Sequence, residues 1–249
     1  MLSVIIITKN EAEHIGRCLS SVSWADEIIV LDSGSTDATV AICQSYGAQV
    51  HVTDWPGFGP QKQRALDKAS QPWVLSLDAD EYINDTLRQA ITDAIASDTA
   101  DGFQIPRLSS YCGRNIRHGG WWPDYVLRLF KRNKGRFTED VVHETIQVSG
   151  TIAQLSTPIL HEAFVDPDEV LAKINHYSAL GATKLDAQGK TANLGTAIFK
   201  GFWTFLRCYF LQLAILDGPE GLMLAISNAE GTYYKYLKLR QLHKPGSHQ

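Results

Sequence analysis

The first half of the chain alternates short apolar runs with segments of helical spacing. Residues 2–8, 27–32 and 73–78 are runs rich in Val, Ile and Leu, which is typical of strands buried on both faces. Residues 48–52 predict a shorter strand. Between these runs we expect helices over residues 11–22, 36–46 and 61–70. Strands that alternate with helices predict a mainly parallel sheet flanked by helices.

The pattern changes after a helix expected over residues 84–97. Strands are predicted over residues 102–108, 125–131 and 151–160, with irregular segments between them. From Pro167 onward the spacing is helical, over residues 167–187, 193–216 and 219–242. We therefore predict an α/β domain over residues 1–165, followed by a helical extension over residues 166–249.

Composition narrows the class of protein. The formal net charge is −4 and no basic stripe runs through the chain, which argues against nucleic acid as a partner. The four cysteines show no C-x-x-C spacing, so a disulfide framework or structural zinc site is not expected. Residues 1–7 read as a strand and not as a signal peptide. We therefore expect a cytoplasmic protein.

Polar clusters follow three of the predicted strands. They are Thr8-Lys9-Asn10-Glu11, Asp32-Ser33-Gly34-Ser35-Thr36-Asp37 and Asp78-Ala79-Asp80-Glu81. Ligands of open α/β sheets bind beyond the carboxyl ends of the strands. Asp78 and Asp80, one residue apart, can place one carboxylate on a metal ion and the other on a sugar or ribose hydroxyl. Oxygen ligands together with substrate phosphates suit Mg²⁺ or Mn²⁺.

Each cluster also has an ordinary structural interpretation. Asp-x-Asp alone is a weak signal, Asp32 can form an Asx turn, and residues 8–11 can cap a helix. Their joint occurrence at three strand ends favours a nucleotide site. No G-x-G-x-x-G and no G-x-x-x-x-G-K-[ST] occurs, so a dinucleotide oxidoreductase and a P-loop protein lose their main support.

These three clusters, with the strands before them, closely resemble the family 2 inverting glycosyltransferases, which have the GT-A fold. Residues 59–64, Gly-Pro-Gln-Lys-Gln-Arg, and the motifs Arg128-Leu129-Phe130 and Val142-His143-Glu144 resemble one branch of that family, which contains lipopolysaccharide-core heptose β-1,4-glucosyltransferases. The resemblance covers about residues 1–160 with specific motifs and continues more loosely beyond them.

The resemblance implies roles at the donor site. The residues expected to bind the nucleotide sugar are Thr8, Asn10 and Glu11 at uracil and ribose, Asp32 at base or ribose, Lys62 and Gln63 at the donor, and Asp78 on the ribose side. It further implies that Asp80 ligates a metal ion that bridges the diphosphate.

In the family, the usual pattern for the catalytic base is an acidic Glu-Asp pair at the start of a late helix. This chain offers Glu139-Asp140 and then His143-Glu144. We expect Glu144 to be the base, with Asp140 as the alternative and Asp124 behind both. His143 is a candidate second metal ligand or phosphate contact, or else a histidine bonded to backbone.

Trp121 and Trp122 follow two glycines in a loop expected to flank the acceptor, although ordinary core packing also accounts for either ring. Arg128, with Arg114 and Arg117, is a candidate for contacts with phosphates of a charged acceptor. Exposed arginines are also commonly only solvated.

Residues 193–216 are apolar enough to suggest a membrane helix, but Lys200, Thr204 and Arg207 form one polar stripe along it. Placing both cations near the bilayer centre costs roughly 2.5–3.5 kcal/mol each. We therefore favour contact with the inner membrane surface, with packing on the domain or in a dimer as the alternative.

Together these features predict a metal-assisted inverting transfer of a hexose, with UDP-glucose as the expected donor. The expected acceptor is a lipid-linked saccharide such as the lipopolysaccharide inner-core heptose. Alternatives are a peptide or polyprenyl phosphate acceptor, or a sugar-nucleotide-binding protein without turnover.

Overall fold

The computed structural model describes residues 1–138 and 145–243, and the chain forms two compact units. The first unit comprises Met1–Arg107 and Asp124–His161, and the second comprises Leu108–Pro123 together with the chain from Glu162 onward. The sequence-based division at residue 165 did not foresee that residues 108–123 belong with the helices. They do so because Tyr111 and Ile116 are buried in the apolar cluster of the second unit.

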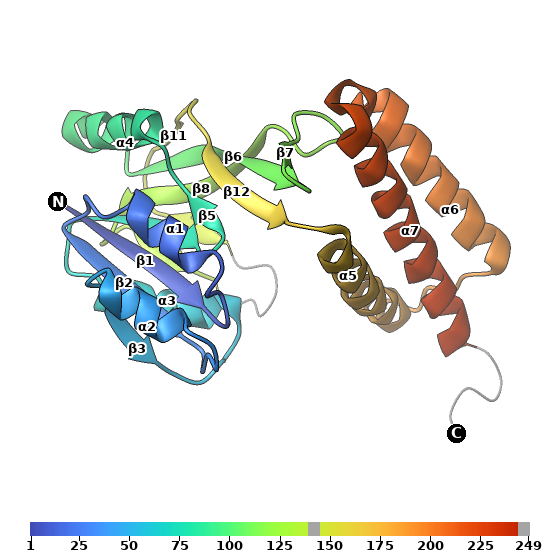
Figure 1. Cartoon of the computed structure of the whole chain (residues 1–249), viewed down its shortest axis with the longest axis horizontal. Helices are drawn as coiled ribbons and strands as arrows, with labels where there is room; N and C mark the ends of the chain where they lie inside the picture. The colour runs from blue at the N-terminus through green and yellow to red at the C-terminus, as the bar shows by residue number, and fades with distance from the viewer. Residues whose placement is uncertain (139–144, 244–249) are drawn as a thin grey trace. The chain divides into compact units, whose positions relative to one another are not determined.

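The first unit is built on one large sheet, with strand order β3-β2-β1-β4-β8-β6-β12-β5 (Figure 1). Its parallel part consists of β1 (Leu2–Thr8), β2 (Glu27–Asp32), β3 (Gln49–Val52) and β4 (Trp73–Asp78). The other strands on this path are β5 (Glu81–Tyr82), β6 (Gly102–Tyr111), β8 (Asp124–Lys131) and β12 (Ile159–Phe164), of which β8 runs antiparallel to both β4 and β6.

Four short strands lie off this path. β11 (Ile152–Gln154) and β7 (Arg114–Asn115) pair with β6, and β9 (Gly135–Phe137) pairs with β10 (Ile146–Val148) in a separate ribbon. The sequence predicted one strand over residues 151–160. The structure has β11 and β12 there instead, separated by a segment that contains Pro158.

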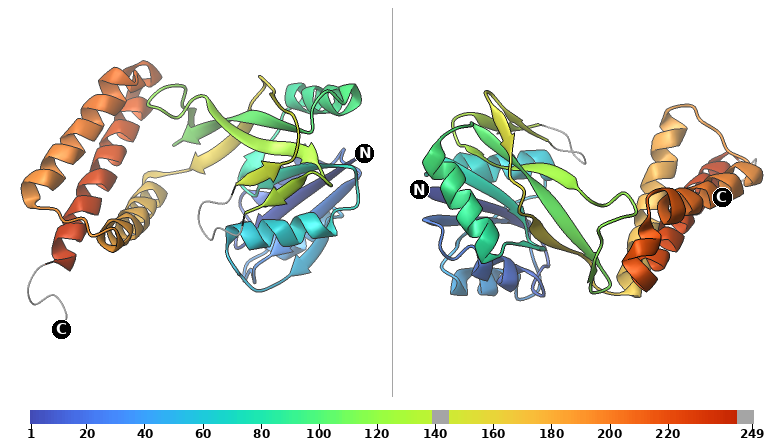
Figure 2. Two further views of the ribbon diagram at one scale, coloured as in Figure 1. Left: turned by 180° about the vertical axis from the view of Figure 1, so that it is seen from behind. Right: turned by 90° about the horizontal axis from the view of Figure 1, so that it is seen from above.

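Helices cover both faces of the parallel strands, as the unbroken apolar runs predicted. On one face Val4 and Ile6 pack in a cluster with residues of α1 (Ile15–Ser21), α2 (Thr39–Ser45) and α4 (Asp85–Ser97). On the other face Ile5 and Ile7 pack with α3 (Phe58–Lys68), which lies in front in the rear view of Figure 2. All seven residues of β1 are buried, so its carboxyl end is held firmly in place.

The second unit contains three long helices. α5 (Pro167–Ala187) has the predicted bounds, because Asp166 accepts a hydrogen bond from the Glu169 backbone amide and Pro167 opens the helix. The helix predicted over residues 193–216 is broken: α6 (Leu194–Leu206) runs into a π-helical turn, η1 (Arg207–Leu211), and a 3₁₀ turn, η2 (Ala214–Asp217). Leu213 and Gly218, which have positive φ, flank the 3₁₀ turn, and α7 (Gly218–Leu242) follows.

Within residues 1–138 and 145–243, no helix by itself has the length and apolar character needed to cross a membrane. The segments Leu194–Leu211 and Ala214–Leu242, bent by 69°, reach that length and composition only as a pair.

Two glycines of α7 provide a matched test of packing. A Cβ on Gly221 would lie 1.9 Å from the Ala214 carbonyl oxygen, whereas one on Gly231 would meet nothing within 4 Å. We expect Gly231→Ala to stabilise the protein by about 0.4–1 kcal/mol, because alanine restricts the unfolded chain. Gly221→Ala should destabilise it by about 1–3 kcal/mol through overpacking. Urea unfolding measures both, and shifts of the same sign would contradict this packing.

Candidate functional site

The three polar clusters lie side by side at one edge of the sheet. In the strand register Thr8 is the partner of Asp32, and Ile7 is the partner of Asp78. Neighbouring strands are about 4.8 Å apart, so the ends of β2 and β4 flank that of β1 at roughly one strand spacing each. Polar groups separated by up to 70 residues of sequence therefore share one small region.

Asp32 builds the loop that follows β2. Its Oδ1 accepts hydrogen bonds from the backbone amides of Gly34 (2.9 Å) and Ser35 (2.8 Å), and its Oδ2 accepts one from the Ser35 hydroxyl. The side chain is only 1% exposed. This is the Asx turn that the sequence allowed. A contact between Asp32 and the donor stays a prediction.

Asn10 joins the loops after β1 and β2. It adopts a positive φ of 56°, its backbone amide donates to Ser35 Oγ (2.8 Å), and its side-chain oxygen accepts from the Thr36 amide (2.8 Å). The Glu11 amide donates to Thr39 Oγ1 over 2.8 Å. These bonds hold the two loops together as one rim of the sheet edge.

Two buried polar oxygens at this edge have no hydrogen-bond partner among the described residues. They are Thr8 Oγ1 and Gln61 Oε1, on side chains that are 6% and 0% exposed. Gln61 does donate to Ser33 and Thr53, so its amide is oriented. A buried unsatisfied polar group costs about 1–3 kcal/mol. A bound polar ligand at the end of β1 would remove that cost, which favours a binding site here.

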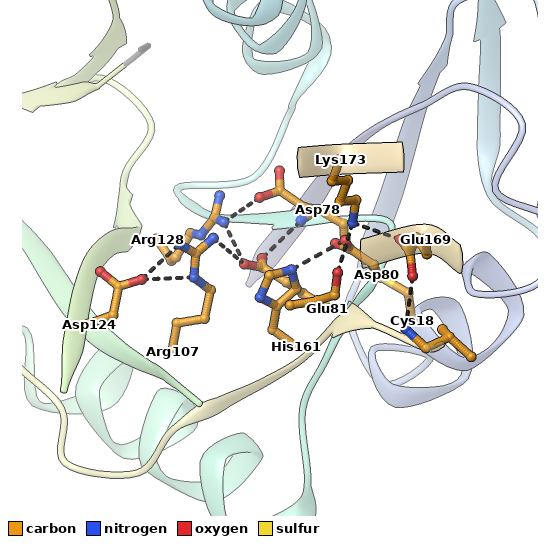
Figure 3. A network of polar contacts seen from close by, with 12 residues as sticks. Cys18, Asp78, Asp80, Glu81, Arg107, Asp124, Arg128, His161, Glu169 and Lys173 are labelled. Carbon is orange, nitrogen blue, oxygen red and sulfur yellow. Dashed lines mark hydrogen bonds and ion pairs between the residues drawn. The ribbon is translucent and has the colours of Figure 1, made fainter. Parts of the chain in front are cut away.

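Asp78 lies between two buried cations. Its Oδ1 is 2.8 Å from Lys62 Nζ. Its Oδ2 is 2.5 Å from Arg128 Nη2, a contact that Figure 3 shows. The same Arg128 nitrogen is 2.6 Å from Oε1 of Glu81, which is completely buried and whose Oε2 accepts from the Asp78 backbone amide (3.0 Å). Two carboxylates thus share the charge of one guanidinium.

This network fixes the charges of its members. Burial would raise the pKa of the Asp78 carboxyl, but the Arg128 guanidinium and the Lys62 ammonium outweigh burial and hold that pKa well below its ordinary value. Burial would lower the pKa of Arg128, and the two carboxylates raise it above its ordinary value instead. Asp78 is therefore ionised throughout the working pH range, and its charge is neutralised from within the protein.

Sequence analysis placed Glu81 in a polar cluster without a role, and it missed Arg107. Glu81 directly follows Asp80, and Arg107 lies on β6 with Nη1 3.6 Å from Glu81 Oε1. Arg107 also holds Asp124 through two hydrogen bonds, at 2.7 and 3.0 Å. The sequence signal that could have identified Arg107 is its positive charge within the mostly apolar strand β6. Because Asp124 is engaged in this ion pair, it is less suited to the role of base.

Asp80 differs from Asp78 in having few contacts. Among the described residues, the one hydrogen bond to its carboxylate comes from His161, with Nε2 3.2 Å from Oδ2. The described residues contain no group of three or more metal-ligating side chains. Mg²⁺ is commonly held by one or two carboxylates, with substrate phosphates supplying further ligands. A half-buried carboxylate with an uncommitted oxygen fits that arrangement, and His161 is a neighbour that the sequence did not reveal.

A cleft of about 450 Å³ opens beside this network, in the first unit. It combines charged walls with apolar and aromatic ones. Its lining includes Lys62, Asp78, Arg107, Arg128, Tyr125 and Phe137. The cleft is therefore bordered by three of the predicted substrate-binding residues, Lys62, Asp78 and Arg128.

Other predicted site residues have structural partners or lie elsewhere. Gln63 accepts from the Phe137 amide (2.9 Å) and donates to Asp67 (2.7 Å), which ties α3 to β9. Trp121 belongs to the second unit and stacks on Phe164 with ring centroids 5.9 Å apart. Trp122, also in that unit, has the Arg117 guanidinium 5.5 Å from its ring. Asp140, His143 and Glu144 lie outside the described residues.

Comparison with known proteins gives one consistent result. The family model described as glycosyl transferase family 2 matches residues 3–153. The lipopolysaccharide core biosynthesis glycosyltransferase LpsC of Rhizobium meliloti is 34% identical over 97% of this chain and 93% of its own length.

Solved structures extend the comparison to the fold. S. aureus TarS 1–349 is 18% identical and superposes with a TM-score of 0.50, over 97% of this chain and 92% of that one. The complex of the same protein with UDP-GlcNAc is 16% identical, with a TM-score of 0.50 over 96% and 91%. The predicted fold, a GT-A-type sheet flanked by helices with a helical extension, is confirmed.

Proposed function

The chain belongs to glycosyl transferase family 2, and on this premise we propose that it moves a hexose from UDP-glucose onto a lipid-linked saccharide, such as the lipopolysaccharide inner-core heptose. The transfer would be a metal-assisted single displacement. The observation that carries the proposal is the cluster at the ends of β1, β2 and β4, where Asp78 is neutralised by cations and Asp80 keeps an oxygen available. The printed name of the Rhizobium meliloti relative supports the acceptor class.

Asp78 and Asp80 have different roles in this proposal. Asp78 is locked by Lys62 and Arg128, so it accepts a ribose hydroxyl at a fixed position without needing a metal charge beside it. Asp80, with His143 as the predicted second ligand, would hold Mg²⁺ or Mn²⁺. The ion, when bound, offsets the charge that gathers on the departing diphosphate. In this proposal the buried oxygens of Thr8 and Gln61, which lack a partner among the described residues, would accept hydrogen bonds from the nucleoside.

The acceptor hydroxyl must lose its proton as its oxygen attacks the anomeric carbon. A carboxylate base typically contributes about 10²–10⁴-fold to the rate of such a step. We assign this role to Glu144, with Asp140 as the alternative. Because a single displacement attacks from the face opposite the nucleotide, the product has the inverted anomeric configuration.

The test is a transfer assay with purified protein, Mn²⁺ and a panel of donors that includes UDP-glucose and UDP-GlcNAc. Acceptors are a lipopolysaccharide truncated to its inner-core heptoses, a polyprenyl phosphate and a peptide. We expect UDP release that depends on the truncated lipopolysaccharide and on UDP-glucose, and a product of inverted configuration. Turnover only with another acceptor class would reject the acceptor assignment, and turnover only with UDP-GlcNAc would reject the donor. Donor binding without turnover on any acceptor would favour the non-catalytic alternative.

For the protein's location, we propose the cytoplasmic face of the inner membrane. A lipid-linked acceptor and a water-soluble nucleotide sugar meet at such a surface. The second unit supplies an argument for how the chain reaches it.

A further inference from the structure

Helix α6 turns its smallest side chains toward α7. Ala197 and Gly201 are buried, and a Cβ on Gly201 would lie 3.1 Å from Tyr233 Cβ and 3.2 Å from the Ala229 carbonyl oxygen. At Gly201 the two helices therefore approach closely, backbone against backbone.

The largest side chains of α6 point away from α7. Ile198, Phe199, Phe202 and Trp203 are between 47% and 64% exposed. At about 100° per residue they occupy one arc of roughly 140°, opposite the arc of Ala197 and Gly201. A surface helix in water has its apolar stripe inward. Helices that pack together within lipid have the opposite arrangement: small residues face the neighbouring helix and large apolar residues face outward.

The same apolar surface continues around the turn between α6 and α7. Five further side chains, all between 46% and 67% exposed, are Phe210, Leu211, Leu213, Ile215 and Leu216. Figure 1 shows this turn at one end of the α6–α7 pair. Together with the four residues of α6, these five make nine exposed apolar side chains within residues 198–216, which we name the elbow face.

The turn is rigidly built and is not a loose loop. The buried carboxylate of Asp217 accepts from the backbone amides of Arg117 (3.2 Å) and His118 (2.8 Å) and contacts His118 Nδ1 at 3.0 Å. The Gln212 carbonyl accepts from the Gly119 amide at 2.8 Å. Residues 117–119 thus hold the exposed leucines and isoleucines in place.

The charged side chains within residues 194–216 have one sign. Lys200 and Arg207 are exposed, and helical geometry places them on one flank of the apolar arc. Residues 194–216 contain no aspartate or glutamate. Cations on the flank of an apolar arc complement an anionic lipid surface.

We propose that the elbow face inserts into the headgroup–acyl boundary of an anionic bilayer and lies in the interface without crossing it. This goes beyond glycosyl transfer, because it assigns a partner to the second unit whatever donor the first unit uses. A second copy of the chain fits less well, since a two-fold interface uses the same patch on both chains and residues 194–216 offer no carboxylate to pair with Lys200 or Arg207 of the other copy. Crossing the bilayer would carry both charges into hydrocarbon.

Vesicle flotation tests the proposal with the intact chain, without donor or acceptor. Vesicles of phosphatidylcholine alone are compared with vesicles containing one-third phosphatidylglycerol. We expect binding to the anionic vesicles, a loss of at least tenfold in Phe199→Ser/Phe202→Ser, and a smaller loss in Lys200→Gln/Arg207→Gln that is confined to the anionic vesicles. The matched control is Leu171→Ser/Tyr177→Ser on α5, where both side chains are similarly exposed, at 56% and 62%. The control should bind as the natural chain does.

A second measurement keeps the elbow face apolar. Lipids brominated near the headgroup should quench tryptophan emission of the natural chain, and Trp203→Phe should lose that part of the quenching. The proposal is overturned if the chain fails to float, if the α5 control loses binding equally, or if bromines at the bilayer centre quench most strongly. A concentration-dependent dimer that the Phe199→Ser/Phe202→Ser variant dissolves, without vesicle binding, would assign the face to a second copy instead. Because no reaction is assayed, failure here leaves the transfer proposal intact.

Discussion

Arg128→Met should destabilise the protein by about 3–5 kcal/mol, because it leaves two carboxylates facing each other without their shared cation. Glu81 is completely buried and Asp78 is half-buried, and Arg128 Nη2 lies within 2.6 Å of both. In the variant Lys62 remains beside Asp78 and Arg107 remains 3.6 Å from Glu81, but Glu81 loses its closest positive charge. Methionine fills a similar volume, which keeps the loss electrostatic. Urea unfolding at pH 7 measures the free energy of unfolding.

The matched control is Arg64→Met, which removes an ion pair of the same chemistry at the surface. Arg64 Nη1 is 2.7 Å from Asp54, but the two side chains are 41% and 78% exposed, so we expect a change of about 0–1 kcal/mol. A comparable decrease in the free energy of unfolding of the two variants would contradict the argument that burial makes the Arg128 ion pairs more important.

The pH dependence of stability identifies the cause of the Arg128 effect. Because the pKa of Asp78 is lowered in the folded state, its contribution is present above the unfolded pKa of about 3.9 and is lost as the pH falls below that value. The natural chain should therefore lose stability in acid. The Arg128→Met variant lacks the guanidinium that lowers this pKa, so its free energy of unfolding should depend less on pH. The difference in free energy of unfolding between the two proteins should therefore narrow below about pH 4.

Much of the first unit was predictable because its strands are buried on both faces. A strand such as β1, with seven consecutive buried residues, has a sequence signal that no other element shares, and its carboxyl end locates the polar cluster after it. The pairing of Thr8 with Asp32 then follows from parallel topology alone. Long-range partners carry no such local signal. Arg107 and His161 entered the site through β6 and β12, whose order in the sheet the sequence could not give.

The second unit shows the complementary limit. Helical periodicity predicted α5 to the residue, yet the break after Leu206 was missed, because residues 207–217 contain neither proline nor glycine. The break depends on contacts with residues 117–119, about a hundred positions away. Trp121 illustrates the same point: its packing on Phe164 required knowing that residues 108–123 leave the sheet domain.

Asp80→Asn should lower the rate of transfer by about 10²–10³-fold, with little effect on folding. An amide in place of the carboxylate weakens the hold on a divalent cation, and such a cation contributes several kcal/mol to the stabilisation of a departing diphosphate, at about 1.4 kcal/mol for each factor of ten. Since the carboxylate of Asp80 has one hydrogen bond within the part of the chain that the structure describes, with His161 at 3.2 Å, the stability of the fold depends little on it. The measurements are UDP release and calorimetric binding of UDP-glucose, each with and without Mn²⁺.

The decisive comparison is between Asp80→Asn and Asp93→Asn, which changes an exposed aspartate on α4. Asp93→Asn should keep both the rate and the gain in donor affinity that Mn²⁺ provides. Asp80→Asn should bind UDP-glucose equally with and without the ion, because the bridge between protein and diphosphate is gone. A variant that keeps the Mn²⁺-dependent gain while losing activity would assign Asp80 a contact with the sugar in place of the metal. Full activity in Asp80→Asn would remove the central carboxylate from the mechanism, and with it the reason for placing the diphosphate at the end of β4.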